Sequence, residues 1–471
     1  APSELRDYIA NMVYVGVLAY LLGIDMEMIK SALDFHFKGK QKPIDLNYGV
    51  VEAAARWSAE NLPPQNRFRV ERMNETCDCV MTDGNTAAAL GSIYGGVQFA
   101  AWYPITPASS LAESLMEYVP MLRKDPVTGK NTCAIIQAED ELAAVGMVTG
   151  AGWAGLRAMT STSGPGMSLM AEYVGLAYFA EVPLVIWDVQ RVGPATGLPT
   201  RTAQGDLTFA YFMSHGDTEH ILLIPGSVNE CFEFGWRAFD IAERLQTPVI
   251  VLSDLDFGMN QWMTPKFKYP NQPMDRGKVL WEEDLERLAG EWKRYADVDG
   301  DGIPYRTVMG NRHPAAAYFT RGTGHTEEAR YSEEADNWER MLLRIKKKYV
   351  TAKTLMPKPA IYTMSGAQVG FIAYGSTDPA VQEARHILEQ RGVKSDYMQI
   401  KAVPFTDEVK EFIQSHLVNY VVELNRDGQM HQLLTLAYPE SALKLVSLAH
   451  LDGLPLTARW IVDAFSAKEV N

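Results

Sequence analysis

Short apolar runs that alternate with helical stretches are the feature of this sequence that most restricts its fold. Between about residue 80 and residue 257, six such runs have the length and composition of buried strands, and helical patterns fall between them. The predicted strands are Val97–Trp102, Cys133–Gln137, Leu156–Ser161, Val182–Val189, His220–Ile224 and Pro248–Ser253. Strands that alternate with helices are typical of a doubly wound parallel sheet. We therefore predict an α/β fold for residues 80–257.

The remaining sequence divides into four further segments. Residues 1–60 have a helical pattern, and residues 61–79 are polar and contain prolines, as a linker does. Residues 258–358 read as an irregular connection with candidate helices at Trp281–Tyr295 and Glu327–Lys348. Alternation resumes in residues 359–471, with predicted strands Val369–Tyr374, Lys394–Ile400 and Tyr420–Leu424. This last segment is therefore predicted to be a second, smaller α/β domain.

Charge and hydropathy exclude several classes of protein. The 471 residues carry a net charge of −14, which argues against nucleic acid as the main partner. No stretch reaches the ~18 apolar residues that a membrane span needs. The first residues, Ala1-Pro2-Ser3-Glu4, do not begin a signal peptide, and only four cysteines occur. We therefore expect a cytoplasmic protein that does not act at a membrane.

Two short motifs invite a metal-binding interpretation, and both lack the required spacing. Cys77-Asp78-Cys79 has one intervening residue, whereas zinc and iron–sulfur sites generally use two. The acidic run that begins at Asp297 has Val308 where a calcium loop of the EF-hand type needs glutamate. The sequence thus predicts no metal site on this chain.

The run Tyr103-Pro104-Ile105-Thr106-Pro107 follows the first strand of the central domain. Each proline fixes its own φ and biases the preceding residue toward extended geometry, so the Thr106 hydroxyl is held on a stiff turn. Ligands of open α/β sheets bind at the carboxyl ends of the strands. Taken alone, the run favours an ordinary strand–turn–helix corner over a ligand site.

Acidic residues follow the next predicted strand. Glu139 and Asp140 suit the first turn of a helix, where carboxylates complement the helix dipole. Glu141 is different, because the helix that it begins, Leu142–Trp153, is almost uncharged and is predicted to be buried. A carboxylate at the start of a buried helix needs a partner or a shifted pKa.

Two more strand ends carry polar groups. The Thr160–Gly166 loop combines hydroxyls with Gly164 and Gly166, which allow the backbone to approach a ligand closely. Arg191 follows the strongest strand, and arginine suits bidentate recognition of a carboxylate. Since these groups and Thr106 and Glu141 end consecutive strands, we expect them to converge on one crevice.

In their order along the chain, these motifs resemble the α subunit of 2-oxoacid:ferredoxin oxidoreductases, which are thiamine-diphosphate enzymes. The resemblance runs from about residue 80 to the end. The helical segment before it is similar to the end of a γ domain that some members fuse ahead of α. The motifs that carry the resemblance are Gly84-Asn85-Thr86-Ala87-Ala88, Tyr103–Pro107, Glu139-Asp140-Glu141, Thr160–Gly166, Arg191-Val192-Gly193-Pro194, Gly197-Leu198-Pro199-Thr200, Gln204-Gly205-Asp206, Tyr374-Gly375-Ser376, Glu423-Leu424-Asn425 and Gly428-Gln429.

The resemblance implies a role for each strand end. Residues 80–257 would grip the aminopyrimidine ring of the cofactor, and Glu141 would be the catalytic carboxylate bonded to N1′ of that ring, with Glu139 a less favoured alternative. Thr106 and Arg191 would hold the carboxylate of the substrate. The implied cofactor-binding residues, besides Glu141, are Tyr103, Pro104, Ile105, Ser163 and Gly164.

The resemblance also implies cofactors and partners outside this chain. A β subunit would hold the diphosphate, Mg²⁺ and a [4Fe–4S] cluster, in an α₂β₂-type hetero-oligomer that uses CoA and reduces ferredoxin. Residues 359–471 would form a domain of the transketolase C-terminal type. The Gly197–Thr200 signature favours 2-oxoglutarate as substrate, with pyruvate and branched-chain 2-oxoacids as alternatives. A transketolase, a β chain of a lipoamide-linked dehydrogenase and a non-catalytic scaffold are the other hypotheses.

Overall fold

The computed structural model describes residues 6–469, which divide into two compact units at Asp78 and Cys79. The first unit is an antiparallel arrangement of helices α1 (Arg6–Leu22), α2 (Met26–His36) and α3 (Gln41–Asn61). Helices α1 and α3 pack closely at Gly16, which has no side chain to separate them. An ideal Cβ there would lie 2.4 Å from the carbonyl oxygen of Val51. The helical pattern predicted for this part of the sequence is confirmed.

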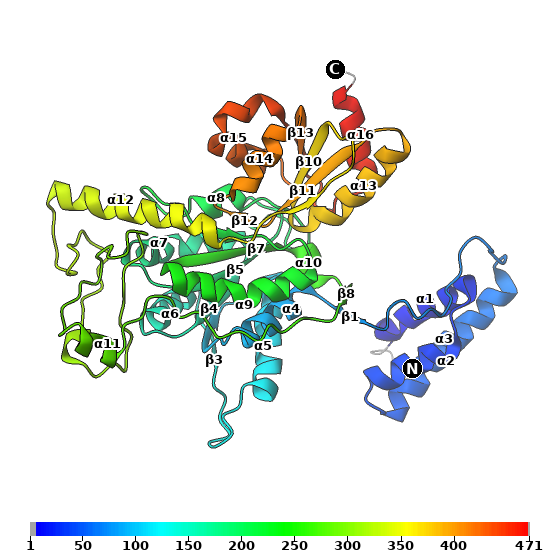
Figure 1. The fold of residues 1–471 in the computed structure, drawn as a ribbon. Helices are drawn as coiled ribbons and strands as arrows, with labels where there is room; N and C mark the ends of the chain where they lie inside the picture. Colours follow the sequence, from blue (N-terminus) through cyan, green and yellow to red (C-terminus); the bar gives the residue numbers. More distant parts are fainter. Residues whose placement is uncertain (1–5, 470–471) are drawn as a thin grey trace. The chain divides into compact units, whose positions relative to one another are not determined.

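The second unit is built on a seven-stranded sheet of order β12-β6-β7-β5-β4-β2-β3 (Figure 1). All neighbouring strands are parallel except the edge strand β12, which runs antiparallel to β6. The strands are β2 (Phe99–Trp102), β3 (Ala134–Gln137), β4 (Ala158–Thr162), β5 (Leu184–Gln190), β6 (Ile221–Leu223), β7 (Pro248–Asp254) and β12 (Ala402–Val403). Each of the six strands predicted between residues 80 and 257 is present, with its ends displaced by at most two residues.

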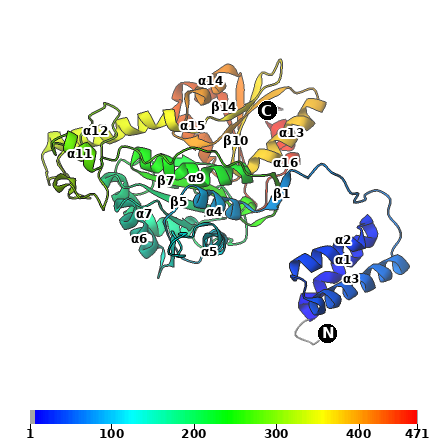
Figure 2. The same ribbon diagram turned by 60° about the horizontal axis from the view of Figure 1, so that its bottom comes forward.

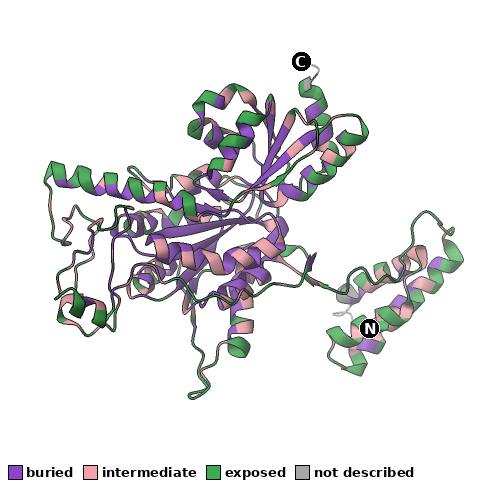
Figure 3. Ribbon diagram, viewed as in Figure 1, coloured by how far each residue is buried: buried purple, intermediate pink, exposed green. Residues whose placement is uncertain are grey.

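Helices cover both faces of this sheet (Figures 1 and 2). Along β5, Leu184 and Ile186 face one apolar cluster, whereas Val185 and Trp187 face the other, and all four are buried. The sheet is therefore buried on both sides, as Figure 3 shows, which explains its continuous apolar strands. The helices on the first face are α6 (Glu141–Trp153), α7 (Gly164–Ala180) and α8 (Leu207–Tyr211); those on the second are α4 (Gly84–Tyr94), α5 (Ser109–Leu122) and α9 (Val228–Leu245).

A five-stranded sheet of order β14-β13-β10-β11-β9 forms the C-terminal domain of the same unit. It is parallel except for β9 at its edge. The strands are β9 (Ala360–Tyr362), β10 (Val369–Tyr374), β11 (Ser395–Ile400), β13 (Val418–Glu423) and β14 (Leu445–Ala449), and the helices are α13 (Asp378–Gln390), α14 (Asp407–Ser415), α15 (Gln429–Ala437) and α16 (Ala458–Glu469). The predicted α/β class is thus confirmed for both sheets, and each sheet is mixed rather than wholly parallel.

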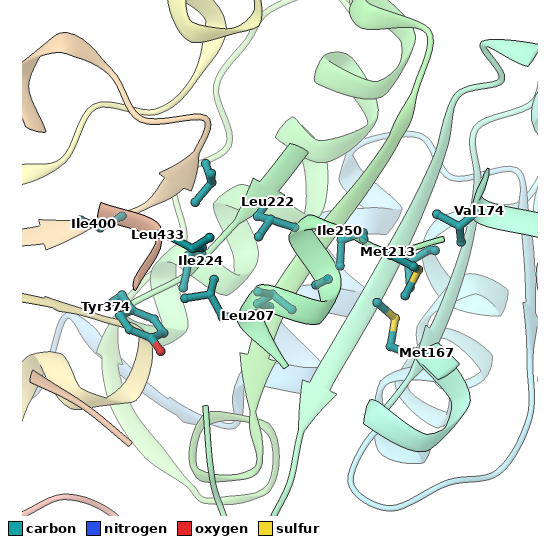
Figure 4. Packing of buried hydrophobic residues seen from close by; sticks show 14 of the residues in the cluster. Met167, Val174, Leu207, Met213, Leu222, Ile224, Ile250, Tyr374, Ile400 and Leu433 are labelled. Carbon is teal, nitrogen blue, oxygen red and sulfur yellow. The ribbon is translucent and has the colours of Figure 1, made fainter. Parts of the chain in front are cut away.

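One apolar cluster joins the two sheets. Figure 4 shows Leu222 and Ile250 of the large sheet in the same cluster as Tyr374, Ile400 and Leu433 of the C-terminal domain. These five residues are each 3% exposed or less. Because the two domains bury apolar side chains against each other, their loops are held in a fixed relation.

The connection between the domains contains less helix than predicted. Helix α11 spans only Glu282–Arg287, since Ala289 and Gly290 have positive φ and end it. Helix α12 spans Ala335–Ala352 rather than Glu327–Lys348, because Ala329 also has positive φ and lies in a turn before it. Two short strands that the sequence reading did not predict, β1 (Cys79–Thr82) and β8 (Trp262–Pro265), pair in antiparallel fashion. The short helix α10 (Leu255–Met259) lies between β7 and β8.

A buried ion network attaches α12 to the large domain. Glu181, at the end of α7, is 1% exposed and pairs with both Arg344 and Lys348 of α12; the Lys348 Nζ to Glu181 Oε2 distance is 3.0 Å. Burial alone would raise the pKa of Glu181, but the charges of Arg344 and Lys348 lower that pKa to about 2. The Glu181 carboxylate is thus stable in the interior because two cations lie against it.

We predict that Glu181→Gln lowers the free energy of unfolding by about 3–5 kcal/mol, because it leaves two buried cations without their counter-ion. The exposed Glu383 of α13 supplies the control, since Glu383→Gln removes a solvated charge and should change stability by about 0.5 kcal/mol or less. Denaturant unfolding of the two variants measures the difference. Equal stability of both variants would contradict the assigned role of the network.

Candidate active site

Four neighbouring parallel strands of the large sheet, β5, β4, β2 and β3, end at one edge. The residues that follow them are Arg191 after β5, Ser163 after β4, the Tyr103–Thr106 run after β2 and Glu141 after β3. Parallel strands place their carboxyl ends side by side, so these four segments are adjacent loops. The four loops are therefore adjacent, whereas the cavity described below is lined by Arg191 and not by Thr106, Ser163 or Glu141.

Glu141 is the first residue of α6 and is only 7% exposed. Asp140 precedes it as the N-cap, and the Asp140 Oδ1 accepts a hydrogen bond of 2.6 Å from the backbone N–H of Ala143. By contrast, no group within residues 6–469 donates a hydrogen bond to the Glu141 carboxylate. Glu139 is exposed. Of the acidic residues in this run, Glu141 is therefore the one that is buried and still free to accept a ligand N–H.

The start of α7 lies directly against Glu141. An ideal Cβ on Gly166 would lie 2.0 Å from the Thr162 Oγ1 and 3.0 Å from the Glu141 Oε1. Only a glycine allows the helix backbone to approach so closely. Two further hydroxyls at this edge, those of Thr160 and Ser163, are buried without a hydrogen-bond partner. The Ser163 hydroxyl therefore adds an unsatisfied polar group to the loop after β4, and the Thr160 hydroxyl adds one within that strand.

Arg191 is 7% exposed and contacts the loop after β2. Its Nη1 donates a hydrogen bond of 2.7 Å to the backbone oxygen of Thr106, and its buried Nε has no partner. The structure thus brings Thr106 and Arg191 together. No hydrogen bond joins either residue to Glu141 within the described chain.

A cavity of about 400 Å³ opens beside Arg191. Gly164 and Ser168 from the start of α7 line it on one side, and Asn425 and Arg426 of the C-terminal domain line it on the other. An arginine with an unused N–H group in the wall of such a cavity can bind a carboxylate.

The remaining predicted cofactor-binding residues lie nearer the surface. Tyr103 is 37% exposed, Pro104 is exposed, and Ile105 is half-buried. The backbone N–H of Ile105 donates to the Ser109 Oγ at 2.9 Å, which fixes the turn at the start of α5. These side chains thus lie at or near the surface of this chain rather than in its interior.

The sequence analysis missed one aspartate at this edge, Asp188, and named its neighbour Asp206 only as part of the Gln204–Asp206 motif. Asp188 lies in β5 and is fully buried, and both of its carboxylate oxygens lack a hydrogen-bond donor. Its carboxyl group faces that of Asp206, and burial together with the charge of Asp206 raises the pKa of Asp188 well above its usual range. A charged residue inside an otherwise apolar strand was the available signal for this site.

Gln204 fixes the position of Asp206 by bonding to the C-terminal domain. Its side chain donates to the backbone oxygen of Tyr374 at 2.8 Å and accepts from the backbone N–H of Leu424 at 2.9 Å. In turn, the Gln429 Nε2 donates to the backbone oxygen of Gly205 at 2.6 Å. The motifs Gln204–Asp206 and Glu423–Gln429, which are remote in sequence, thus form one clamp between the domains.

Comparison with known proteins identifies the family. The model of the family described as "Pyruvate flavodoxin/ferredoxin oxidoreductase, thiamine diP-bdg" matches residues 90–276. The α subunit of 2-oxoacid:ferredoxin oxidoreductase 2 from Aeropyrum pernix is 34% identical over 97% of this chain and 71% of its own length. The chain belongs to the family of 2-oxoacid:ferredoxin oxidoreductase α subunits.

Other members of this family differ in how much of their length the chain covers. The 2-oxoglutarate synthase subunit KorA of Methanothermobacter marburgensis is 36% identical over 74% of this chain and 88% of its own length. By contrast, the chain spans 62% of the α subunit of Sulfurisphaera tokodaii 2-oxoacid:ferredoxin oxidoreductase 1. The 2-oxoglutarate:ferredoxin oxidoreductase of Magnetococcus marinus, solved with 2-oxoglutarate, coenzyme A and succinyl-CoA bound, has a TM-score of 0.86 and 30% identity, over 100% of this chain and 80% of that one.

Residues 6–469 lack two classes of feature. None of the helices there is both long and apolar enough to cross a membrane. Within the same residues, no group of three or more histidine, cysteine, aspartate or glutamate side chains is placed to hold a metal ion.

We predict that Gly166→Ala lowers the free energy of unfolding by about 1–3 kcal/mol, because the new methyl group overlaps Thr162 and Glu141. Gly150 of α6 is the matched control, since a Cβ there meets nothing within 4 Å. Gly150→Ala should be neutral or stabilise the helix by up to about 1 kcal/mol. Thermal and denaturant unfolding measure both variants, and a Gly166→Ala chain as stable as the unmodified one would contradict this packing.

Proposed function

We propose that this chain is the α subunit of an enzyme that oxidatively decarboxylates 2-oxoglutarate. The overall reaction converts 2-oxoglutarate, CoA and two oxidised ferredoxins into succinyl-CoA, CO₂, two reduced ferredoxins and a proton. The observation that carries this proposal is the single sheet edge at which buried Glu141 and the Thr106–Arg191 contact occur. The similarity to the 2-oxoglutarate synthase subunits and to the 2-oxoglutarate-bound structure supports this choice of substrate.

The residues at this edge fit thiamine diphosphate. The cofactor would supply the electron sink for decarboxylation. Its aminopyrimidine ring carries a nitrogen that needs a carboxyl partner, and the Glu141 carboxyl is buried without one. In this proposal Glu141 holds a proton at N1′ of that ring, and burial at the start of α6 keeps water from competing for it.

Arg191 and Thr106 form the substrate end of the site in this proposal. The Arg191 Nη1 is already anchored to Thr106, so the guanidinium plane is oriented before substrate arrives. The guanidinium lines the cavity, where it would act as a charge-assisted donor to the carboxylate of the 2-oxoacid. The exposed Tyr103 and Pro104, with Ile105, Ser163 and Gly164, would complete the cofactor pocket against a partner subunit.

The proposal includes a β subunit that supplies the diphosphate site, Mg²⁺ and the [4Fe–4S] cluster, in an α₂β₂-type assembly that passes electrons to ferredoxin. Naming of the relatives as α subunits supports such a partner. The proposal also includes a cytoplasmic location, because all four cysteines are free thiols, as a reducing compartment keeps them.

The experiment that tests the function uses the purified native complex under anaerobic conditions with CoA and oxidised ferredoxin. Rates of ferredoxin reduction are compared for 2-oxoglutarate, pyruvate and 2-oxoisovalerate. The proposal predicts CoA-dependent reduction with a strong preference for 2-oxoglutarate. A preference for another acid would change the substrate, and no reduction by a complex that holds its cofactors would contradict the function.

We predict that Glu141→Gln lowers kcat by a factor of about 100 or more, because an amide cannot hold the proton at N1′. The complex should still assemble, since the substitution keeps the shape of the side chain. Glu139→Gln is the control, and this exposed position should retain near-normal turnover. Steady-state kinetics of the two variant complexes decide between the carboxylates, and the opposite pattern would assign the role to Glu139.

We predict that Arg191→Ala raises KM for the 2-oxoacid by roughly 10- to 100-fold, because the substrate carboxylate loses a charged donor. Arg201 lies in the same loop region and is exposed, so Arg201→Ala should leave KM within about twofold. The comparison is made in initial-rate assays of the assembled complexes. An unchanged KM in the Arg191→Ala enzyme would place the carboxylate site elsewhere.

A further inference from the structure

An acidic side chain that the proposed reaction does not use, that of Asp206, lines the cavity beside Arg191. Asp206 lines this cavity and is half-buried, and its carboxylate lies against Gly164, where an ideal Cβ would be 2.8 Å from the Oδ2. The Oδ2 has no hydrogen-bond donor. Arg191 lines the same cavity, so a substrate carboxylate bound there faces a cation and an anion together.

Asp206 is paired with a second carboxyl group behind it. Asp188 has no donor for either oxygen, and its side chain faces Asp206. Two buried carboxyl groups in contact cannot both be ionised, because their repulsion is weakly screened. One proton must therefore lie between them, and it serves as the donor that both oxygens of Asp188 and the Oδ2 of Asp206 otherwise lack.

Position decides which of the two keeps the proton. Asp188 is 0% exposed within β5, whereas Asp206 faces the cavity, Arg191 and the start of α7. Burial and the charge of Asp206 hold the pKa of Asp188 well above its usual range. Burial also raises the pKa of Asp206, to about 6, although Arg191 opposes this shift. Near neutral pH Asp188 is thus the acid and Asp206 the anion.

We propose that Asp188 and Asp206 act as one proton-sharing pair whose negative charge, exposed at Asp206, weakens binding of the 2-oxoacid carboxylate to Arg191. Asp206 is a positioning residue in this scheme, since it tunes Arg191 and does not touch the reacting atoms. The inference rests on the proposed function, because it uses Arg191 as the site of the substrate carboxylate.

The other charges around the cavity do not replace this effect. Arg426 and Asp427 also line it, but they pair with each other at 2.7 Å and belong to the C-terminal domain. Arg191 and Asp206 are the remaining charged lining residues. The clamp through Gln204 and Gln429 fixes the backbone beside Asp206.

The pH dependence follows from the charge of Asp206. Above its pKa of about 6 the carboxylate is ionised and repels the substrate carboxylate, so KM is high. As the pH falls through about 6, Asp206 gains a proton, the repulsion disappears and KM falls. A unit charge in the wall of such a cavity changes carboxylate binding by about three- to tenfold.

The test measures KM and kcat for 2-oxoglutarate in the α–β complex between about pH 5.5 and about pH 8, with two isosteric variants. Asp206→Asn should have a KM about fivefold lower than the unmodified enzyme at about pH 8, no further fall at low pH, and an unchanged kcat. Asp188→Asn should keep the KM of the unmodified enzyme and its pH dependence, because the amide N–H replaces the proton of Asp188 as donor to Asp206. The kcat values separate tuning of binding from damage to the reaction.

Three results would overturn the inference. They are an Asp206→Asn enzyme that keeps the pH dependence of KM, an Asp188→Asn enzyme that loses it, and equal damage to kcat in both variants, as a structural role predicts. If none of the tested 2-oxoacids supports ferredoxin reduction by the unmodified complex, the proposed function fails. The pair is then still tested by infrared spectra of the complex, in which the band of a protonated carboxyl group must be lost in Asp188→Asn.

Discussion

The parallel register of β5, β4, β2 and β3 is the constraint on which the rest of this site depends. Thr162 at the end of β4 is the register partner of Asp188 in β5, and Trp102 at the end of β2 is the partner of Gln137 in β3. Since every strand in this row ends at the same edge, the loop that follows each strand must lie there too. The chemistry of the site is thus spread over four sequence segments that no local interaction brings together.

A second constraint comes from the C-terminal domain, which forms one side of the cavity beside Arg191. Gln204 exchanges hydrogen bonds with Leu424, and the Asn425 Nδ2 donates to the backbone oxygen of Gln204 at 3.0 Å. The apolar cluster shared by the two sheets supports these bonds. The loop that carries Asp206 is therefore held from both domains, which gives a structural reason for two motifs so far apart in the sequence.

The sequence predicts the centre of the fold well because the central strands are buried on both faces, so that β5 and β7 appear as continuous apolar runs. The two-residue strand β12 and the pair β1 and β8 carry no such pattern, since their pairing depends on tertiary contacts. The convergence of Thr106 and Arg191 could be predicted from strand order. The pairing of Asp188 with Asp206 could not, because it depends on where the loop after β5 returns to the sheet.

The central claim is that the buried Glu141 carboxyl activates the bound cofactor. The most direct test is the rate at which the acidic C–H of thiamine diphosphate, bound to the α–β complex without substrate, exchanges with solvent deuterium. The account predicts rapid exchange in the unmodified complex and exchange slower by a factor of about 100 or more in Glu141→Gln, with the cofactor still bound. Equal exchange rates in the two complexes would contradict the account, because another group would then control the proton at N1′.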